Sequence, residues 1–405
     1  MTADPTAPAR RSRLPRVALL GPGGYGRVHL AGLAGRHRAG RLRLVAVADR
    51  PGAAPPELPD GTRFTTDWRG LVADADLDVA VIATPPHRHA EMALAAFGAG
   101  LDVLLEKPAT LRVADLDGLA TVARVAGVRC QVGFQSLGSI ALDALCAALV
   151  SGELGEPTAV GVRGAWRRSS GYYGRADWAG RRLADGRPGD GTLLNPFAHA
   201  VVNGLVVAGA AFGRDAEPAH AADAVAAELY RAHDIEVDDT SSLRLRTTDG
   251  VMVTIATTLC ADEVLDPVVE VRGSRGTAEL SYQHDVLTLA GRTAELRSHR
   301  HDLLDDLLDA RAQGRPLRCP LERTRPALVA VERATAVAGP PVPVPDRAVL
   351  RQPAHDGTSA VVVPGVTAAI TRCSREALLL SETGPPWAAP VEPCPPGDVS
   401  VAGTG

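Results

Sequence analysis

Lys107 is the only lysine in this chain of 405 residues, in which lysines and arginines together number 43. Arginine cannot lose its proton, whereas lysine carries a compact ammonium whose pKa falls readily on burial. A chain that otherwise uses arginine throughout has a reason to keep this lysine. The residue type therefore favours a catalytic or substrate-polarising amine over chance retention on a solvated loop.

Asn195 and His199 are four residues apart, on one face of a helix that we predict from Asn195 to about residue 208. Asn195 is a good N-cap, as Asp would be, and Pro196 suits the first helical position. The amino end of a helix disfavours a charged imidazole, so we expect a neutral His199 that can accept a proton. Such a pair alone is more often structural; a lysine-bearing cofactor site elsewhere in the chain favours catalysis.

Residues 166–182 form a segment that we call the aromatic–arginine segment, because it holds four of the nine Trp and Tyr residues among several arginines. Aromatic faces and arginines suit a polyhydroxylated or anionic ligand, through stacking and forked hydrogen bonds. An oligomer contact fits equally well, because the same residues dominate interfaces. The predicted substrate contacts are Trp166, Tyr172, Tyr173, Arg175, Trp178 and Arg181.

A glycine-rich turn follows a buried apolar run at residues 17–20 and has the G-x-G-x-x-G pattern of dinucleotide-binding turns. In that pattern Gly21 permits the turn, Gly23 lets backbone approach a pyrophosphate, and Gly26 lets a helix pack on the strand. A second apolar run, residues 42–48, ends at Asp49, about where a ribose-binding carboxylate belongs. Asp49 favours NAD, and Arg50, which could pair with a 2'-phosphate, leaves NADP open.

The elements that must position these residues begin with alternating strands and helices. We predict further strands at residues 79–83, 101–105 and 128–134, and helices at 89–97 and 113–125. This alternation indicates a doubly wound parallel sheet in a Rossmann domain over residues 16–136. Ligands collect at the carboxyl ends of such strands, where Lys107 falls.

The pattern changes after residue 136 to short strands joined by turns. The predicted strands are 159–162, 225–230, 242–247, 251–259, 268–272, 278–282 and 286–289, and helices at 302–312 and 322–334 close the domain. We expect an α+β domain over residues 137–383 with a large, mainly antiparallel open sheet. Helices on one face would leave the other to a second subunit, in a homodimer or homotetramer. Residues 1–15 are expected to be a disordered arm and 384–405 a Pro- and Gly-rich tail.

Composition excludes several classes of protein. A formal net charge of -4 supplies no basic field for nucleic acid. The apolar run after Arg10-Arg11 is too short to direct export or span a membrane. Six isolated cysteines fit a reducing cytoplasm and no metal or redox motif. We expect no metal at residues 87–89, which lack a third ligand, and a solvated turn rather than a metal site at the acidic cluster 233–239.

Together these residues resemble the glucose-fructose oxidoreductase / inositol dehydrogenase (Gfo/Idh/MocA) family over roughly residues 15–340. The matching pieces are the glycine turn followed by His29, Thr84-Pro85 with His89, Glu106-Lys107-Pro108, and the helix carrying His199. The resemblance implies that Lys107 lies beside the reacting carbon and that His199 exchanges the hydroxyl proton. Many members carry Asp four residues before this His, where the present chain has Asn195; a sugar-oxidising branch has similar loops before an Asn-x-x-x-His helix.

The sequence thus predicts an NAD(P)-dependent oxidoreductase that acts on a secondary hydroxyl of a sugar, cyclitol or sugar derivative. Alternatives are an NAD-dependent glycoside hydrolase of the same fold and a non-catalytic dinucleotide-binding sensor. Accumulation of NADH would separate the dehydrogenase from both. The predicted cofactor contacts are Gly21, Gly23, Gly24, Tyr25, Gly26, Asp49, Arg50, Thr84, Pro85, His87, Glu106, Lys107 and Gln135.

Overall fold

The computed structural model of the chain describes residues 13–53, 57–74, 76–211, 221–248, 250–289, 296–297 and 299–388. The chain forms two compact units, each of which is built from several stretches. The first unit comprises the described parts of Met1–Thr110, Ala114–Gly133 and Asp302–Glu322. The second comprises those of Leu111–Val113, Phe134–His301 and Arg323–Gly405.

A six-stranded parallel sheet forms the centre of the first unit, in the order β3-β2-β1-β4-β5-β6. The strands in that order are Arg63–Thr65, Arg43–Ala48, Arg16–Leu20, Val79–Ile82, Asp102–Leu105 and Cys130–Val132. Every residue of β4 and β5 is buried, as expected where helices cover both faces of a parallel sheet. The predicted doubly wound Rossmann domain is confirmed. Its helices are α1 (Gly26–Arg38), α2 (Trp68–Val72), α3 (His89–Gly98) and α4 (Val113–Ala126).

Helix α8 (Leu303–Gln313) belongs to this first unit, although we predicted that it would close the second domain. Leu303, Leu304 and Leu307 pack into the core of the parallel sheet. Arg311 donates to the carboxylates of Asp78 and Asp102, which lie at the amino ends of β4 and β5. Apolar burial and these ion pairs together dock a late segment onto an early sheet, a contact that local sequence patterns do not encode.

The second unit contains a nine-stranded sheet in the order β14-β13-β12-β11-β7-β10-β9-β8-β15. The strands in that order are Leu296–Arg297, Val286–Leu289, Gly276–Ser281, Cys260–Gly273, Pro157–Arg167, Met252–Thr258, Thr240–Thr247, Ala221–Arg231 and Val342–Pro343. Two pairs, β7 with β10 and β8 with β15, are parallel; the other pairs are antiparallel. The predicted large, mainly antiparallel sheet is confirmed.

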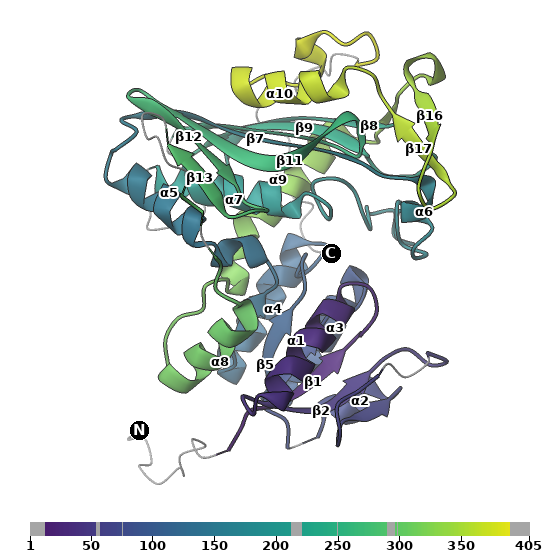
Figure 1. Ribbon diagram of the computed structural model, residues 1–405, viewed down its shortest axis with the longest axis vertical. Coiled ribbons are helices and arrows are strands. Elements are labelled where there is room, and N and C mark those ends of the chain that lie inside the picture. The colour runs from purple at the N-terminus through teal and green to yellow at the C-terminus, as the bar shows by residue number, and fades with distance from the viewer. Residues whose placement is uncertain are drawn as a thin grey trace, which may run out of the picture. The chain divides into compact units, whose positions relative to one another are not determined.

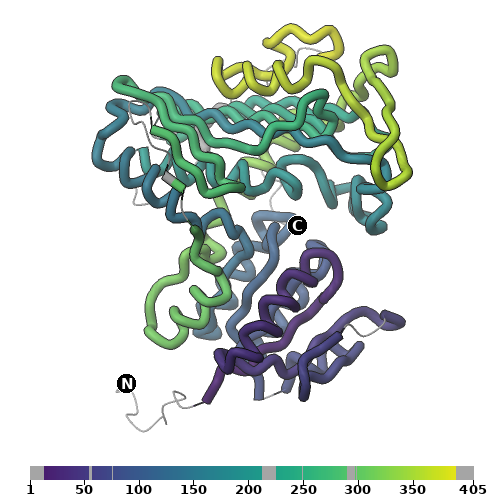
Figure 2. Tube along the Cα trace, in the orientation of Figure 1, coloured from purple at the N-terminus to yellow at the C-terminus, as the bar shows by residue number. Residues whose placement is uncertain are grey.

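Helices lie on both sides of this sheet (Figure 1). One side carries α5 (Ile140–Val150), α7 (Ala198–Ala210) and α9 (Leu321–Ala338), and the opposite side carries α10 (Val366–Glu376). Figure 2 shows the last part of the chain, in yellow, with α10 on that opposite side and the preceding hairpin beside the end of the sheet. This C-terminal segment also contains the hairpin β16 (Leu350–Pro353) and β17 (Ser359–Val362), η4 (Asp346–Ala348) and η5 (Ser381–Thr383).

The C-terminal segment covers a sheet face that we expected to be open. Val366, Ile370 and Cys373 of α10 are buried in one cluster with Tyr230, Ala256 and Cys260 of the sheet. The backbone comes so close that a Cβ on Gly161 would lie 2.2 Å from the carbonyl oxygen of Ser374. The expectation of an open face is therefore wrong for β7, β10 and β8, and a subunit could not use that region without displacing α10.

A buried carboxylate holds the same segment in place. Glu228 on β8 is 1% exposed and accepts hydrogen bonds from Tyr230, Ser242 and both the amide and the hydroxyl of Ser381. Trp387 is also buried, with its ring 5.2 Å from that of Tyr230. The tail predicted for residues 384–405 lies outside the described residues from 389 onward, whereas Trp387 is packed. Most of the predicted arm, residues 1–12, also lies outside them.

No helix in the described ranges is both long enough and apolar enough to cross a lipid bilayer.

Candidate active site

The glycine turn joins β1 to α1 in the first unit. Gly21 has φ 85°, and a Cβ there would lie 2.9 Å from the carbonyl oxygen of Ala83. A Cβ on Gly26 would lie 1.8 Å from the carbonyl oxygen of Gly21, so only glycine closes this turn. A Cβ on Gly23 would meet nothing within 4 Å, and Gly23, Gly24 and Tyr25 are exposed. The turn thus leaves open space beside an exposed backbone at a helix amino end, as a pyrophosphate requires.

Asp49 follows β2 directly beside this turn. The carbonyl oxygen of Ala48, the last residue of β2, accepts a hydrogen bond of 2.9 Å from the amide of Gly21. The Asp49 carboxylate accepts one of 2.7 Å from the amide of Arg50. These bonds fix the strand end and the carboxylate next to the first glycine. A carboxylate in this position can accept hydrogen bonds from the ribose hydroxyls of a dinucleotide.

Glu106 is fixed between α1 and β6 at the carboxyl end of β5. Its side chain is 9% exposed, and Oε1 lies 2.7 Å from Nε2 of His29 on α1. Oε2 accepts a hydrogen bond from the backbone amide of Lys107. A Cβ on Gly133 would lie 2.7 Å from Oε1 of Glu106. The Glu106 carboxylate therefore positions the backbone of Lys107. His29 in turn helps to hold this carboxylate in place.

His89 is fully buried and is not available as a cofactor or metal ligand. Its Nδ1 lies 2.8 Å from the carbonyl oxygen of Pro108, and its Nε2 lies 2.8 Å from that of Thr84. Burial lowers the pKa of His89. The ring joins the turn after β4 to the turn after β5, so it helps to position Lys107. His87, by contrast, is an exposed residue near the same turn. Partial desolvation of its ring, followed by the positive charge of Arg88, lowers its pKa.

His199 lies near the start of α7 in the second unit. Its Nδ1 is 2.8 Å from Oγ of Ser136, which lies 3.1 Å from Oδ1 of Asn203. Either group can be the donor of the hydrogen bond between Ser136 and His199, according to the imidazole tautomer, and the bond holds the His199 ring at its Nδ1 edge. The rings of Phe134 and Tyr282 flank His199 at 5.3 and 6.5 Å.

Asn195 is not the N-cap that we predicted. Helix α7 begins at Ala198, with Phe197 at the N-cap position and no side-chain cap. The preceding residues form tight turns, in which the amide of Asn195 bonds to Gly191 and that of Phe197 bonds to Thr192. The side chain of Asn195 instead donates through Nδ2 to Oδ1 of Asp190 at 3.0 Å. Turn hydrogen bonds thus delay the helix beyond the point that residue preferences indicate.

The aromatic–arginine segment forms a stack within the second unit. The guanidinium of Arg175 lies 3.7 Å from the ring centre of Tyr172 and 4.9 Å from that of Trp178. Trp166 packs against Phe197 with ring centres 4.4 Å apart, which connects the stack to the start of α7. Burial raises the pKa of the Tyr172 phenol, so that ring stays neutral at physiological pH. The hairpin β16–β17 supports the segment, since Ala360 forms an isolated bridge with Ser169.

The two arginines predicted to bind substrate are already paired with carboxylates. Arg175 donates to Asp190 at 3.2 Å, and Arg181 donates to Glu236 at 3.1 Å. Sequence reasoning did not select Arg168, which lies 5.0 Å from the ring centre of Trp166 and 5.2 Å from that of Tyr172. Its Nε is buried without a partner among the described residues. Its position two residues after Trp166, within the aromatic–arginine segment, was the available sequence signal.

Tyr173 lies between this stack and a buried cluster. Its ring is 5.1 Å from that of Tyr172 and 4.9 Å from that of His233. Nδ1 of His233 is 2.8 Å from Oδ2 of Asp239 and 3.5 Å from Sγ of Cys260. His233, Asp239 and Cys260 could together hold a metal ion by distance. Oδ2 of Asp239, however, already accepts from the amides of residues 232 and 233. The predicted solvated turn is wrong here, because these three side chains are buried; the exposed members are Asp234 and Glu236.

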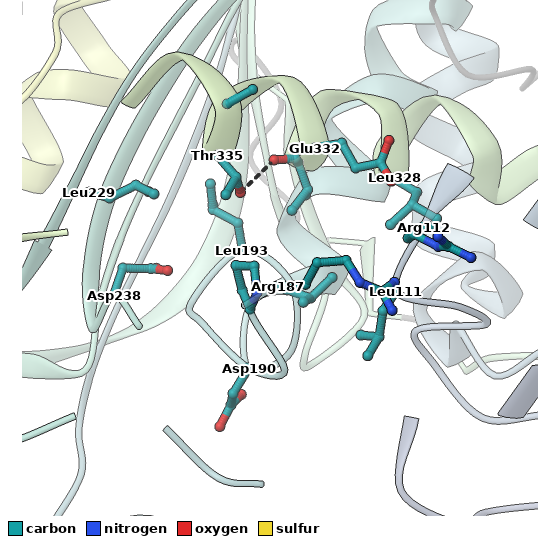
Figure 3. Close-up of a pocket in the computed structure, with 14 residues that line it drawn as sticks. Leu111, Arg112, Arg187, Asp190, Leu193, Leu229, Asp238, Leu328, Glu332 and Thr335 are labelled. Carbon is teal, nitrogen blue, oxygen red and sulfur yellow. Dashed lines mark hydrogen bonds between the residues drawn. The ribbon is translucent and has the colours of Figure 1, made fainter. Parts of the chain in front are cut away.

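A cavity of about 260 Å³ lies in the second unit between α9 and residues 187–194 (Figure 3). Leucines from several elements line it, together with Val331, Asp238 and Glu332. Asp190 lies at its edge in Figure 3, with the carboxylate turned away from the other labelled residues. Asn195 and His199 do not line this cavity. It therefore backs the loop that carries Asp190 and is not the candidate site itself.

Each unit thus brings together part of the predicted set. The first unit gathers the glycine turn, Asp49, Arg50, the Thr84–His87 turn, Glu106 and Lys107 at the carboxyl ends of its strands. The second gathers Asn195, His199 and the aromatic–arginine segment. Gln135, predicted to contact the cofactor, opens η3 (Gln135–Gly138) in the second unit, where its neighbour Ser136 contacts His199.

Comparison with known proteins agrees with this division. A family model described as "Oxidoreductase family, NAD-binding Rossmann fold" matches residues 15–134, and one described as "GFO/IDH/MocA C-terminal domain" matches residues 143–279. Inositol 2-dehydrogenase 1 of Saccharopolyspora erythraea is 32% identical over 148 residues, which are 36% of this chain and 44% of that protein. The match thus spans less than half of that relative's length.

Two solved structures share the fold. The WlbA dehydrogenase from Bordetella pertussis, in complex with NADH and UDP-GlcNAcA, has a TM-score of 0.65 at 23% identity, covering 82% of this chain and 99% of that one. A levoglucosan dehydrogenase in complex with NADH and L-sorbose has a TM-score of 0.66 at 19% identity, covering 80% and 97%. At these identities the likeness establishes the fold.

Proposed function

Because the chain belongs to the GFO/IDH/MocA family of NAD-binding oxidoreductases, we propose that it is a dehydrogenase acting on a secondary hydroxyl of a sugar, cyclitol or sugar derivative. The observation that carries this proposal is the placement of His199 near the start of α7, where Oγ of Ser136 holds its Nδ1 at 2.8 Å. An imidazole oriented in this way can serve as a general base for a hydroxyl proton.

The proposed mechanism divides the work between two residues. Lys107 stabilises the negative charge that develops on the substrate oxygen, and Nε2 of His199 accepts the hydroxyl proton. Bound NAD would supply the acceptor for the hydride that leaves the same carbon, so that the secondary alcohol becomes a ketone. Glu106, by holding the Lys107 amide, keeps the lysine at the end of its strand.

We propose NAD as the better cofactor. Asp49 lies beside the glycine turn, where a carboxylate accepts hydrogen bonds from ribose hydroxyls and repels a 2'-phosphate. Arg50 is exposed, so some use of NADP is compatible with the site.

We propose a neutral polyhydroxylated substrate rather than an anionic one. Arg175 and Arg181 already face carboxylates, so their forks are not arranged for a ligand's acid group. The aromatic rings of Trp166, Tyr172 and Trp178 suit the apolar faces of a sugar ring. Arg168 can donate to substrate hydroxyls from its place beside two of these rings.

A cytoplasmic location is supported by the cysteines among the described residues, at positions 130, 146, 260, 319 and 373, which are all buried and free. A homo-oligomer, if it forms, would use a surface other than the part of the sheet that α10 covers.

A substrate screen tests the proposal. Purified protein with NAD is mixed with neutral sugars, cyclitols, sugar acids and glycosides, and NADH is followed by its absorbance. We expect NADH with one group of neutral polyols and less with the corresponding acids. Release of an aglycone without NADH would instead identify a glycoside hydrolase, and binding of NADH without any turnover would identify a sensor.

A further inference from the structure

Asp190 is a buried carboxylate that joins the aromatic–arginine segment to the residues before α7. It is 2% exposed, and its partners Asn195, Gly180 and Arg175 all belong to the second unit. Oδ1 accepts from Nδ2 of Asn195 at 3.0 Å. Oδ2 accepts from the amide of Gly180 at 3.0 Å and from Arg175 at 3.2 Å. Three donors thus satisfy the oxygens of this buried side chain.

The charge of Asp190 determines how the Asn195 amide is turned. A carboxylate only accepts hydrogen bonds, so Nδ2 of Asn195 must face Asp190 and Oδ1 must be directed elsewhere. An amide at position 195, unlike a carboxylate, does not take up the proton of a substrate hydroxyl. Proton transfer then falls to His199, four residues further along the chain, near the start of α7.

Asp190 also places the negative charge that an aspartate at position 195 would have carried. Here an amide occupies position 195, and the carboxylate stands one side chain behind it. The pair therefore keeps one negative charge close to the start of α7. An aspartate at position 195 would instead put two carboxylates about 3 Å apart, a geometry in which one of them retains a proton.

The third contact of Asp190 acts on the aromatic–arginine segment. Arg175 lies against Tyr172 and Trp178 and also donates to the carbonyl oxygen of Tyr172. Its bond to Asp190 ties this stack to the same carboxylate that orients Asn195. Asp190 thus fixes Asn195 and the Arg175 stack in position relative to each other.

We propose that Asp190 is a positioning residue of the sugar or cyclitol dehydrogenase site, orienting Asn195 through Oδ1 and Arg175 through Oδ2. The inference rests on the proposed function, because its first readout is turnover of a polyol. It assigns Asp190 no contact with the reacting atoms. Its effect passes through the two side chains that it holds.

The experiment compares Asp190→Asn, Asn195→Asp and the double variant that exchanges the two residues. Asp185→Asn is the matched control, because Asp185 is an exposed carboxylate of the same region. For each, kcat and KM for the best neutral polyol are measured from pH 6 to 9, with the Kd for NADH and the melting temperature.

We expect Asp190→Asn to lower kcat/KM by about tenfold to a hundredfold, the size of a lost hydrogen bond to a charged group. We expect Asn195→Asp to be impaired at pH 8 and to recover as the pH falls, because the carboxylate pair then gains a proton. The exchange variant should recover kcat and lose this pH dependence. Its KM should stay raised, since Arg175 lacks its carboxylate. The Kd for NADH should be unchanged throughout.

Two results would overturn the proposal. One is Asn195→Asp with wild-type activity and an unchanged pH profile. The other is Asp190→Asn with a lower melting temperature but wild-type kcat and KM, which would leave Asp190 a structural role alone.

A failure of the proposed function gives a different result. If no polyol leads the wild-type protein to reduce NAD, the dehydrogenase assignment falls. The contact between Asp190 and Asn195 is then measured from the free energies of unfolding of the same variants in denaturant, combined in a double-mutant cycle. Absence of coupling between positions 190 and 195 would overturn the positioning role on its own.

Discussion

Oγ of Ser136 lies 2.8 Å from Nδ1 of His199 and 3.1 Å from Oδ1 of Asn203. These contacts hold the imidazole at one edge. Replacing the imidazole should therefore cost more than replacing the serine that orients it. We expect His199→Ala to lower kcat by about a hundredfold to ten-thousandfold, the contribution of a general base.

The Ser136→Ala variant should lose less activity than His199→Ala, because the base remains but its ring is no longer held at Nδ1. Steady-state kinetics measure both effects, and fluorescence titration with NADH should give wild-type affinity for each variant. Ser151→Ala, a change at an exposed serine, serves as the control. Wild-type turnover in His199→Ala would remove this residue from the mechanism.

Lys107 gives a chemical test as well as a mutational one. Because Lys107 is the only lysine, an amine reagent can modify only its side chain and the chain's amino terminus. Labelling located by mass spectrometry should fall at Lys107 when NAD and substrate are present together. Lys107→Arg replaces a compact ammonium by a planar fork, so activity should fall at least about a hundredfold while folding survives. Near-normal turnover in Lys107→Arg would contradict the catalytic assignment.

The glycine turn offers a pair of variants that separates binding from folding. A Cβ on Gly23 meets no protein atom within 4 Å, so Gly23→Ala should melt like the wild type yet bind NADH more weakly. A Cβ on Gly26 would lie 1.8 Å from the carbonyl oxygen of Gly21, so Gly26→Ala should lower both stability and binding. Thermal unfolding with NADH titration distinguishes them. Equal NADH affinity in Gly23→Ala and wild type would place the pyrophosphate elsewhere.

Asp49 should decide the preference between the two dinucleotides. Asp49→Ser removes the charge that repels a 2'-phosphate, so the ratio of kcat/KM for NAD to that for NADP should fall. Kinetics with both cofactors at one substrate concentration measure this ratio. A wild-type enzyme that already prefers NADP tenfold would refute our interpretation of the end of β2.

Two substitutions in α10 test whether this helix packs on the sheet. Ile370 is fully buried against the sheet, whereas Ala368 on the same helix is exposed. Ile370→Glu should lower the melting temperature by many degrees, because it buries an unpaired charge, and Ala368→Glu should change it little. Light scattering should show self-association of Ile370→Glu, since the apolar face is uncovered. Identical melting of the two variants would mean that α10 does not cover the face in solution.

Local residue patterns predicted most of the first unit, but they missed β3, α2 and the docking of α8. Fully apolar strands, the glycine turn and the carboxylate after β2 each depend on a few consecutive residues, and the parallel sheet follows from their alternation. The importance of Lys107 could also be inferred from sequence, because its isolation is a property of composition. These features survive in the structure because short-range sterics and hydrophobic periodicity act within one element or between neighbours.

Only the tertiary structure decided which partners the site residues have. Asp190 and Asn195 are close because tight turns before α7 replace the predicted cap, and Ser136 reaches His199 from a different element. The docking of α8 on the parallel sheet and of α10 on the antiparallel one joins segments far apart in sequence. Such contacts depend on the burial of whole faces and on buried charges finding donors. No local spacing encodes them, so the sequence determined the chemistry available and the fold determined which groups act together.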